Sequence, residues 1–147
     1  MHMPAAPDRP SQLVSTSNKD ANRLTDQQIG KLIAFGLIFW LVAALFIRWA
    51  PLDLFAGGGG TRLLFAATIP VAWLSVQLAK RLATLTAGQL LPGVAIASAA
   101  AMLCDGVGLV WWSVYGEGDR LPGAAWILWG VGCILFAAFS VDRRQGA

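Results

Sequence analysis

Apolar residues dominate four long stretches of this chain, and polar or charged residues collect between them. The four stretches cover about residues 32–49, 63–79, 90–114 and 121–141. A transmembrane helix needs about 20 predominantly apolar residues, and these stretches are close to that length. The pattern predicts an all-α integral membrane protein, a four-helix bundle formed by one domain over residues 25–144.

Signals for the helix ends support this assignment. Thr25 precedes the first stretch and Gln28 follows three residues later, which is the pattern of a capping box. Pro51 ends the first helix, because proline disrupts helical hydrogen bonding. Between the first two stretches, Gly57–Arg62 forms a glycine-rich connector in which we expect Thr61 to cap the second helix.

Pro70 lies in the middle of the second stretch. Proline has no backbone N–H, so it frees the carbonyl of Ala66 and favours a kink. Thr68 and Ser75 carry hydroxyls that are available to satisfy such freed groups.

Residues 1–24 differ from the rest of the chain, being rich in Pro, Ser, Asn and Asp without an apolar period. Such a segment buries too little apolar surface to offset the entropy lost on ordering, so we expect a disordered tail. A signal peptide is the alternative for this end of the chain. No small-x-small cleavage site closes the first apolar stretch, which favours an uncleaved membrane anchor.

The distribution of basic residues predicts the orientation. With a cytoplasmic amino terminus and four spans, both ends of the chain lie in the cytoplasm, and eight basic residues face inside against three outside. This asymmetry agrees with the positive-inside rule. The inner set is Arg9, Lys19, Arg23, Lys31, Lys80, Arg81, Arg143 and Arg144, and the outer set is Arg48, Arg62 and Arg120.

Composition narrows the class of protein further. Hydrophobic residues make up 56% of the 147 residues and charged residues 13%, about half of what a soluble domain carries. These values argue against a soluble enzyme, and the absence of a basic run longer than two argues against a nucleic-acid partner. The single histidine is His2, so the usual general base and the commonest metal ligand are missing from the spans. We therefore expect neither an enzyme, nor a cofactor, nor a metal site.

Cys104 and Cys133 both lie in apolar stretches and are not a C-x-x-C pair. Buried free thiols that behave as small hydrophobic side chains are the expected state. The seven tryptophans are divided between the interfaces and the interior, and we expect the deeper Trp40 and Trp73 to fill contacts between helices.

Asp105 is the ionisable residue that lies well inside a predicted span, roughly 22 Å from Leu90 and roughly 14 Å from Val114. A charge at this depth costs at least about 2.5 kcal/mol, so Asp105 should face the bundle or a wet cavity, or carry a proton. Its role is then either proton or cation coupling, or a buried hydrogen bond that fixes the helix register. No Lys or Arg lies at its level, which favours a hydrogen-bonded carboxyl over an ion pair.

Three hydroxyl residues complete the polar site predicted inside the spans: Ser98 on the helical face of Asp105, and Ser75 and Thr68 on the second span. Small residues from Gly93 to Ala101, with Gly130 and Gly132, let helices approach closely. Such faces serve internal packing and homo-oligomers equally well.

Two short motifs lie in the third and fourth predicted spans. The first is Leu103-Cys104-Asp105-Gly106-Val107-Gly108-Leu109, followed by an aromatic cluster and Tyr115-Gly116. The second is Gly123-Ala124-Ala125-Trp126-Ile127-Leu128-Trp129-Gly130. With these motifs the chain resembles a group of small bacterial four-span membrane proteins without a known activity. The resemblance covers residues 30–142 and implies a four-span fold in a bacterial inner membrane. Small multidrug exporters, by contrast, carry a Glu in their first span, whereas the single Glu here is Glu117 in a loop.

Three function classes follow. The first is a non-catalytic inner-membrane protein that acts through helix–helix contacts, as a homo-oligomer or as an accessory or assembly subunit of a membrane complex. The second is a small oligomeric transporter or channel that couples protons or cations through Asp105. The third, a membrane enzyme, needs several polar residues that converge in one cleft, and the spans offer too few.

Overall fold

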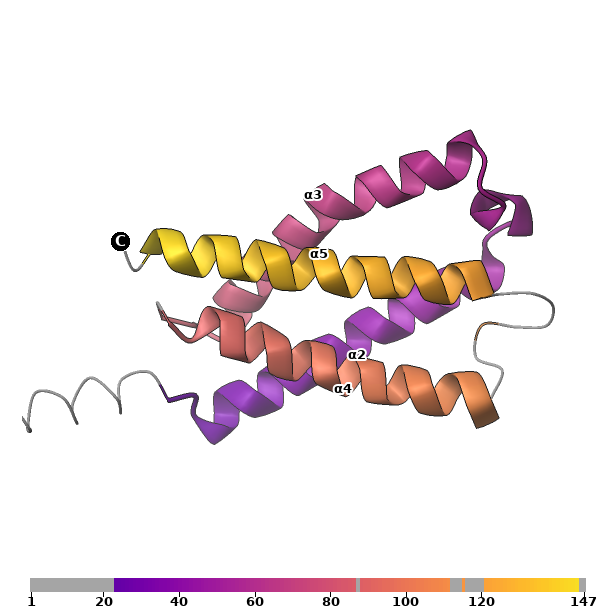
Figure 1. Ribbon diagram of the computed structural model, residues 1–147. Coiled ribbons are helices and arrows are strands. Elements are labelled where there is room, and N and C mark those ends of the chain that lie inside the picture. Colours follow the sequence, from indigo (N-terminus) through magenta and orange to yellow (C-terminus); the bar gives the residue numbers. More distant parts are fainter. Residues whose placement is uncertain (1–22, 87, 112–114, 116–120, 146–147) are drawn as a thin grey trace, which may run out of the picture.

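In the computed structural model, described for residues 23–86, 88–111, 115 and 121–145, four long helices form a bundle (Figure 1). They are α2 (Asp26–Trp49), α3 (Gly59–Leu82), α4 (Leu90–Trp111) and α5 (Leu121–Gln145), and a short 3-10 helix, η1 (Leu52–Phe55), connects α2 to α3. All four are long and apolar enough to cross a membrane. The predicted all-α fold with four membrane-spanning helices is confirmed.

Three helices extend beyond the predicted spans, because polar residues form the added turns: α2 and α3 begin earlier, and α3 and α5 end later. The described helix α4, by contrast, lies within its predicted span of 90–114. The capping box is present: Thr25 Oγ1 accepts from the backbone N–H of Gln28, whose side chain accepts from the backbone of Thr25. At the other end of the chain, α5 continues through Arg143 and Arg144, where basic side chains complement the helix dipole. Of the predicted tail, residues 1–22 lie outside the described residues, and Leu24 packs against the core.

The prediction that Thr61 caps α3 is wrong. The helix begins earlier, at Gly59, with Gly58 as its N-cap residue. Thr61 lies inside the first turn, where its hydroxyl donates to the carbonyl of Leu54 at 2.8 Å and accepts from the N–H of Gly57 at 3.0 Å. The side chain therefore holds the connector against α3 instead of starting the helix.

The helices do not pack most closely with their neighbours in sequence. The closest pairings are α2 with α4 and α3 with α5, and contacts between α4 and α5 join the two pairs. By contrast, α2 and α3 contact each other little. At the end of the bundle where η1 lies, α3 stands well apart from α2 (Figure 1).

One close approach explains how α2 lies on α4. A Cβ added to Gly36 would lie 2.3 Å from the backbone carbonyl oxygen of Ala97, so glycine is required at this crossing. The small-residue stretch around Ala97 is therefore used, at least here, for packing inside the molecule, as expected for helices that meet without a hydrophobic driving force.

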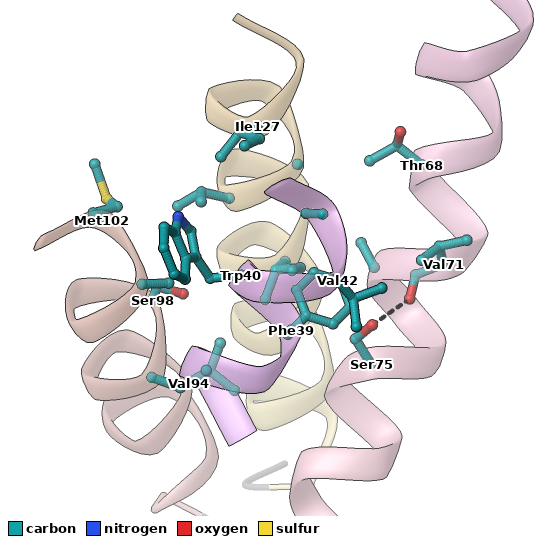
Figure 2. Close-up of a pocket in the computed structure, with 18 of the residues that line it drawn as sticks. Phe39, Trp40, Val42, Thr68, Val71, Ser75, Val94, Ser98, Met102 and Ile127 are labelled. Atoms are coloured by element: carbon teal, nitrogen blue, oxygen red, sulfur yellow. Dashed lines mark hydrogen bonds between the residues drawn. The ribbon is translucent and has the colours of Figure 1, made fainter. Parts of the chain in front are cut away.

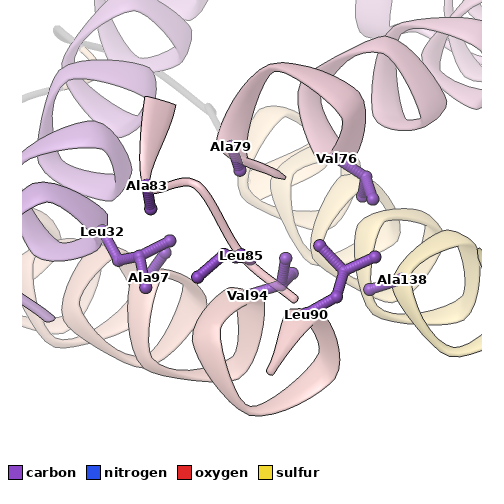
Figure 3. Close-up of a cluster of buried hydrophobic side chains, with 9 residues drawn as sticks. All are labelled: Leu32, Val76, Ala79, Ala83, Leu85, Leu90, Val94, Ala97 and Ala138. Atoms are coloured by element: carbon purple, nitrogen blue, oxygen red, sulfur yellow. The ribbon is translucent and has the colours of Figure 1, made fainter. Parts of the chain in front are cut away.

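The buried side chains form two clusters near opposite ends of the bundle. Where α2 begins and α5 ends, which we call the terminal end, a cluster brings together all four helices and the α3–α4 connection (Figure 3). At the opposite end, which we call the η1 end, Ala44, Ile47, Phe55 and Tyr115 form a second cluster. The members of the first cluster are Leu32, Val76, Ala79, Ala83, Leu85, Leu90, Val94, Ala97 and Ala138.

Polar side chains close the terminal end. Gln28 Nε2 donates to the carbonyl of Ala83 at 3.1 Å, and Gln89 Nε2 donates to the carbonyl of Arg23 at 2.9 Å. Asp142 of α5 accepts from the backbone N–H of Gly88 at 2.9 Å. These bonds tie the start of α2 and the end of α5 to the α3–α4 connection.

Candidate functional site

A cavity of about 320 Å³ lies between the α2–α4 pair and the α3–α5 pair. Figure 2 shows Ser98 and Met102 of α4 on one side and Thr68, Val71 and Ser75 of α3 on the other, with Trp40 of α2 beside α4. Most of the lining is aliphatic or aromatic. Cavities of this size and character are typical of sites for small ligands.

Asp105 lines this cavity from α4 and is half-buried. Its Oδ1 accepts two hydrogen bonds: Trp40 Nε1 of α2 donates at 2.6 Å, and the hydroxyl of Tyr115 donates to the same oxygen. Both donors are neutral, so they replace hydrogen bonds that water would give without forming an ion pair. The carboxyl group is therefore fixed in place from two other parts of the chain.

Tyr115 reaches Asp105 from beyond the end of α4. Its side chain is 2% exposed and packs in the cluster with Ala44, Ile47 and Phe55. Burial raises the pKa of the Tyr115 phenol well above its ordinary value, and the hydrogen bond to Asp105 raises it further. The phenol thus stays protonated and acts as a permanent donor.

Thr68 and Ser75 line the same cavity from α3, and both bond to their own helix. Thr68 Oγ1 donates to the carbonyl of Leu64 at 2.8 Å, and Ser75 Oγ donates to the carbonyl of Val71 at 2.8 Å. Neither hydroxyl bonds to Ala66, the carbonyl that Pro70 frees. Thr68 Oγ1 also accepts from Trp126 Nε1 of α5 at 2.8 Å, which ties α3 to α5.

All four predicted polar residues, Asp105, Ser98, Ser75 and Thr68, line the one cavity. They share its walls, but no hydrogen bond in the described part of the chain joins any two of them. Ser98 lies about two turns before Asp105 on α4, on the same helical face. The structure thus groups these residues around a space and does not connect them in a network.

Three residues of the site are absent from the predicted set of polar residues, because they are aromatic side chains that donate hydrogen bonds. They are Trp40, Tyr115 and Trp126. The sequence favours a hydrogen-bonded carboxyl for Asp105 without naming its donors, which are an indole and a phenol. One signal was present in the sequence, because a tryptophan as deep as Trp40 needs a partner for its N–H group. Tyr115, as the single tyrosine of the chain, gave no comparable sign.

The remaining chemistry of the described residues is sparse. Cys104 and Cys133 are both thiols and are half-buried. Within the described ranges, no group of three or more His, Cys, Asp or Glu side chains is placed to share a metal ion. No family model, curated protein or solved structure matches the chain.

Proposed function

We propose that this protein is a small polytopic inner-membrane protein without a catalytic site, and that it binds an apolar molecule of the bilayer in the cavity between its helix pairs. The observation that carries the proposal is the position of this cavity. The helices α2 and α3, which contact each other little, both line it. A molecule dissolved in the bilayer therefore has a path into the protein from the side.

Exposed side chains on the cavity wall support this lateral path. Val42 of α2 is 62% exposed and Val71 of α3 is 48% exposed, although both line the cavity. In a spanning helix such apolar exposed side chains face lipid. At these two side chains the cavity wall is thus continuous with the lipid-facing surface.

The cavity wall selects the kind of occupant. All four helices contribute to it, and most of its residues are aliphatic or aromatic. An acyl chain or another small amphiphile of the bilayer therefore matches this lining. Burial of such a chain gains packing contacts that an empty cavity forfeits.

The test is a titration of the purified protein in detergent micelles with methyl decanoate, a neutral amphiphile. The readout is the indole N–H resonances of isotope-labelled tryptophan. Trp40 and Trp126 line the cavity, while Trp49 and Trp111 are largely exposed at the helix ends and serve as internal controls. We expect the indole N–H chemical shifts of the two cavity residues to change with ligand concentration and to saturate. The shifts of the two control residues should stay constant or change linearly without saturation.

A matched pair of variants on α3 controls for unspecific partitioning. Ala67→Leu places a larger side chain in the cavity, whereas the neighbouring Ala66→Leu adds the same groups outside its lining. We expect Ala67→Leu to weaken binding by about tenfold, since the lost volume excludes part of the ligand. Equal titration curves for wild type and Ala67→Leu contradict the proposal.

A second candidate function is an accessory or assembly subunit, and the exposure of α5 favours it. Among the four spans α5 is the least buried, with 6% of its apolar window inside the molecule. A groove of about 880 Å³ runs along α3 and α5, and a Cβ added to its residue Gly132 would meet nothing within 4 Å. One transmembrane helix of a partner protein is the occupant that we assign to this groove, because a glycine lets another helix approach closely.

Co-purification in mild detergent tests the second candidate. We expect the wild type to elute in a complex larger than the 15.6 kDa chain, and Gly132→Leu to release it. Gly106→Leu on α4, an equally open position, is the matched control. Elution of the wild type as a monomer contradicts this candidate.

A further inference from the structure

The two oxygens of the Asp105 carboxyl group have different surroundings. Oδ1 accepts from both Trp40 and Tyr115, whereas no bond to Oδ2 is present among the described residues. No fully buried side-chain oxygen or nitrogen in the described part of the chain lacks a partner, so Oδ2 is accessible. Asp105 lines the cavity, and its carboxyl group retains an acceptor that the bonds from Trp40 and Tyr115 do not use.

The cavity has little else to offer a polar ligand. The hydroxyls of Thr68 and Ser75 already donate within α3. Ser98 contributes one further hydroxyl about 10 Å along α4 from Asp105. No Lys, Arg, His or Glu is among the lining residues that the structure describes, so Asp105 is the one titratable side chain there.

Aromatic rings surround the rest of the cavity. Trp40 uses its indole N–H for Asp105, and its ring also lines the cavity (Figure 2). Phe35, Phe39, Phe46 and Trp126 add four more rings. Aromatic faces attract cations, most strongly where water is excluded. A carboxylate beside several aromatic rings in an apolar cavity is complementary to a positively charged group with a hydrocarbon tail.

We propose that the cavity binds a lipophilic cation, an amphiphile whose ammonium group pairs with Oδ2 of Asp105 and whose hydrocarbon part fills the space between α2 and α3. This inference rests on the proposed binding function and names the chemistry of its ligand. The cation-coupled transporter that the sequence offered as an alternative would need such a binding step.

The experiment compares decylammonium with methyl decanoate in the same indole N–H titration at about pH 7, where an alkylammonium is charged. The two probes have chains of similar length and differ in charge and in hydrogen-bond donors. We expect decylammonium to bind at least tenfold more tightly than methyl decanoate, with the largest shift at Trp40. Similar affinities of the two probes overturn the inference.

Asp105→Asn provides the second arm, because asparagine keeps an oxygen that accepts from Trp40 and Tyr115 but removes the charge. We expect it to lower the affinity for decylammonium at least tenfold relative to the affinity for methyl decanoate, measured on the same variant. Asp53→Asn in η1, outside the cavity lining, is the matched control and should change neither affinity. Unchanged binding of decylammonium to Asp105→Asn overturns the inference.

The outcomes separate this inference from the proposed function. Saturable binding of methyl decanoate without a preference for decylammonium overturns the cation site alone. Absence of saturable binding by both probes overturns the proposed function as well. If Asp105→Asn does not fold, the comparison of the two probes on the wild type decides.

Discussion

Asp105 brings a carboxyl group into an apolar bundle, and its two donors account for how the fold accommodates it. A charge inside a span costs at least about 2.5 kcal/mol. Hydrogen bonds between transmembrane side chains contribute about 0.6 to 1.7 kcal/mol each, so the bonds from Trp40 and Tyr115 offset roughly 1 to 3 kcal/mol. The donors thus compensate about half of this minimum cost at the average bond value, and all of it at the upper value.

The titration of Tyr115 tests this arrangement directly, because it is the single tyrosine of the chain. Burial and the bond to Asp105 raise its pKa in the folded protein. We expect the ultraviolet absorbance of tyrosinate to be absent at pH 11 in micelles, about one unit above the ordinary value of about 10. After unfolding, the transition should return to about pH 10.

The sign of the stability effect follows from the same shift. The folded state holds the phenolic proton more tightly than the unfolded state. The contribution of Tyr115 to stability is therefore complete below about pH 10 and is lost as the pH rises through the folded-state pKa. A folded-state transition near pH 10 would show that the phenol is neither buried nor bonded. The variant Tyr115→Phe has no tyrosine and provides the background absorbance that is subtracted.

At the level of elements, the sequence predicted the number and approximate places of the helices, because long apolar stretches and caps are local signals. The capping box at Thr25 could be predicted for this reason. The role of Thr61 could not be predicted, because its hydrogen-bond partner Leu54 belongs to the preceding connector. The pairing of α2 with α4 was also beyond the sequence. Helices that are apolar on all sides have no amphipathic pattern, so the sequence does not indicate which face packs against another helix.

Gly36 tests the pairing of α2 with α4. Gly36→Ala directs a methyl group at the carbonyl of Ala97, only 2.3 Å away, so the helices must separate. We expect a loss of about 1 to 3 kcal/mol in unfolding free energy, measured by denaturation in micelles. Gly30→Ala is the control on the same helix, since its Cβ meets nothing within 4 Å. Equal stability of the two variants would refute the close crossing.

For the whole molecule, an even number of spans places the start of α2 and the end of α5 at one end of the bundle (Figure 1). The polar candidates could be named from the sequence because hydroxyls and carboxylates stand out among apolar residues. Their arrangement around one cavity depends on how α3 inclines away from α2, which no local pattern encodes.

The orientation in the membrane is open to a reporter test in a bacterial host. Lys31, Lys80, Arg81, Arg143 and Arg144 lie toward the terminal end, and Arg48 and Arg62 toward the η1 end. The positive-inside rule therefore predicts a cytoplasmic terminal end. Green fluorescent protein fused after residue 145 should fluoresce, and alkaline phosphatase inserted at residue 58 should be active. Exchanging the two reporters is the control, and the reversed pattern would contradict this orientation.

The alternating pairing of the helices has a consequence for biogenesis. A chain that enters the membrane in order delivers α2 and α3 before either has its main partner, because α2 packs on α4 and α3 on α5. During this interval the indole of Trp40 and the hydroxyl of Thr68 lack the contacts that α4 and α5 later supply. Helices α2 and α3 therefore cannot form their main helix pairings until α4 and α5 have entered the membrane. A chain interrupted after α3 should be a substrate for membrane quality control.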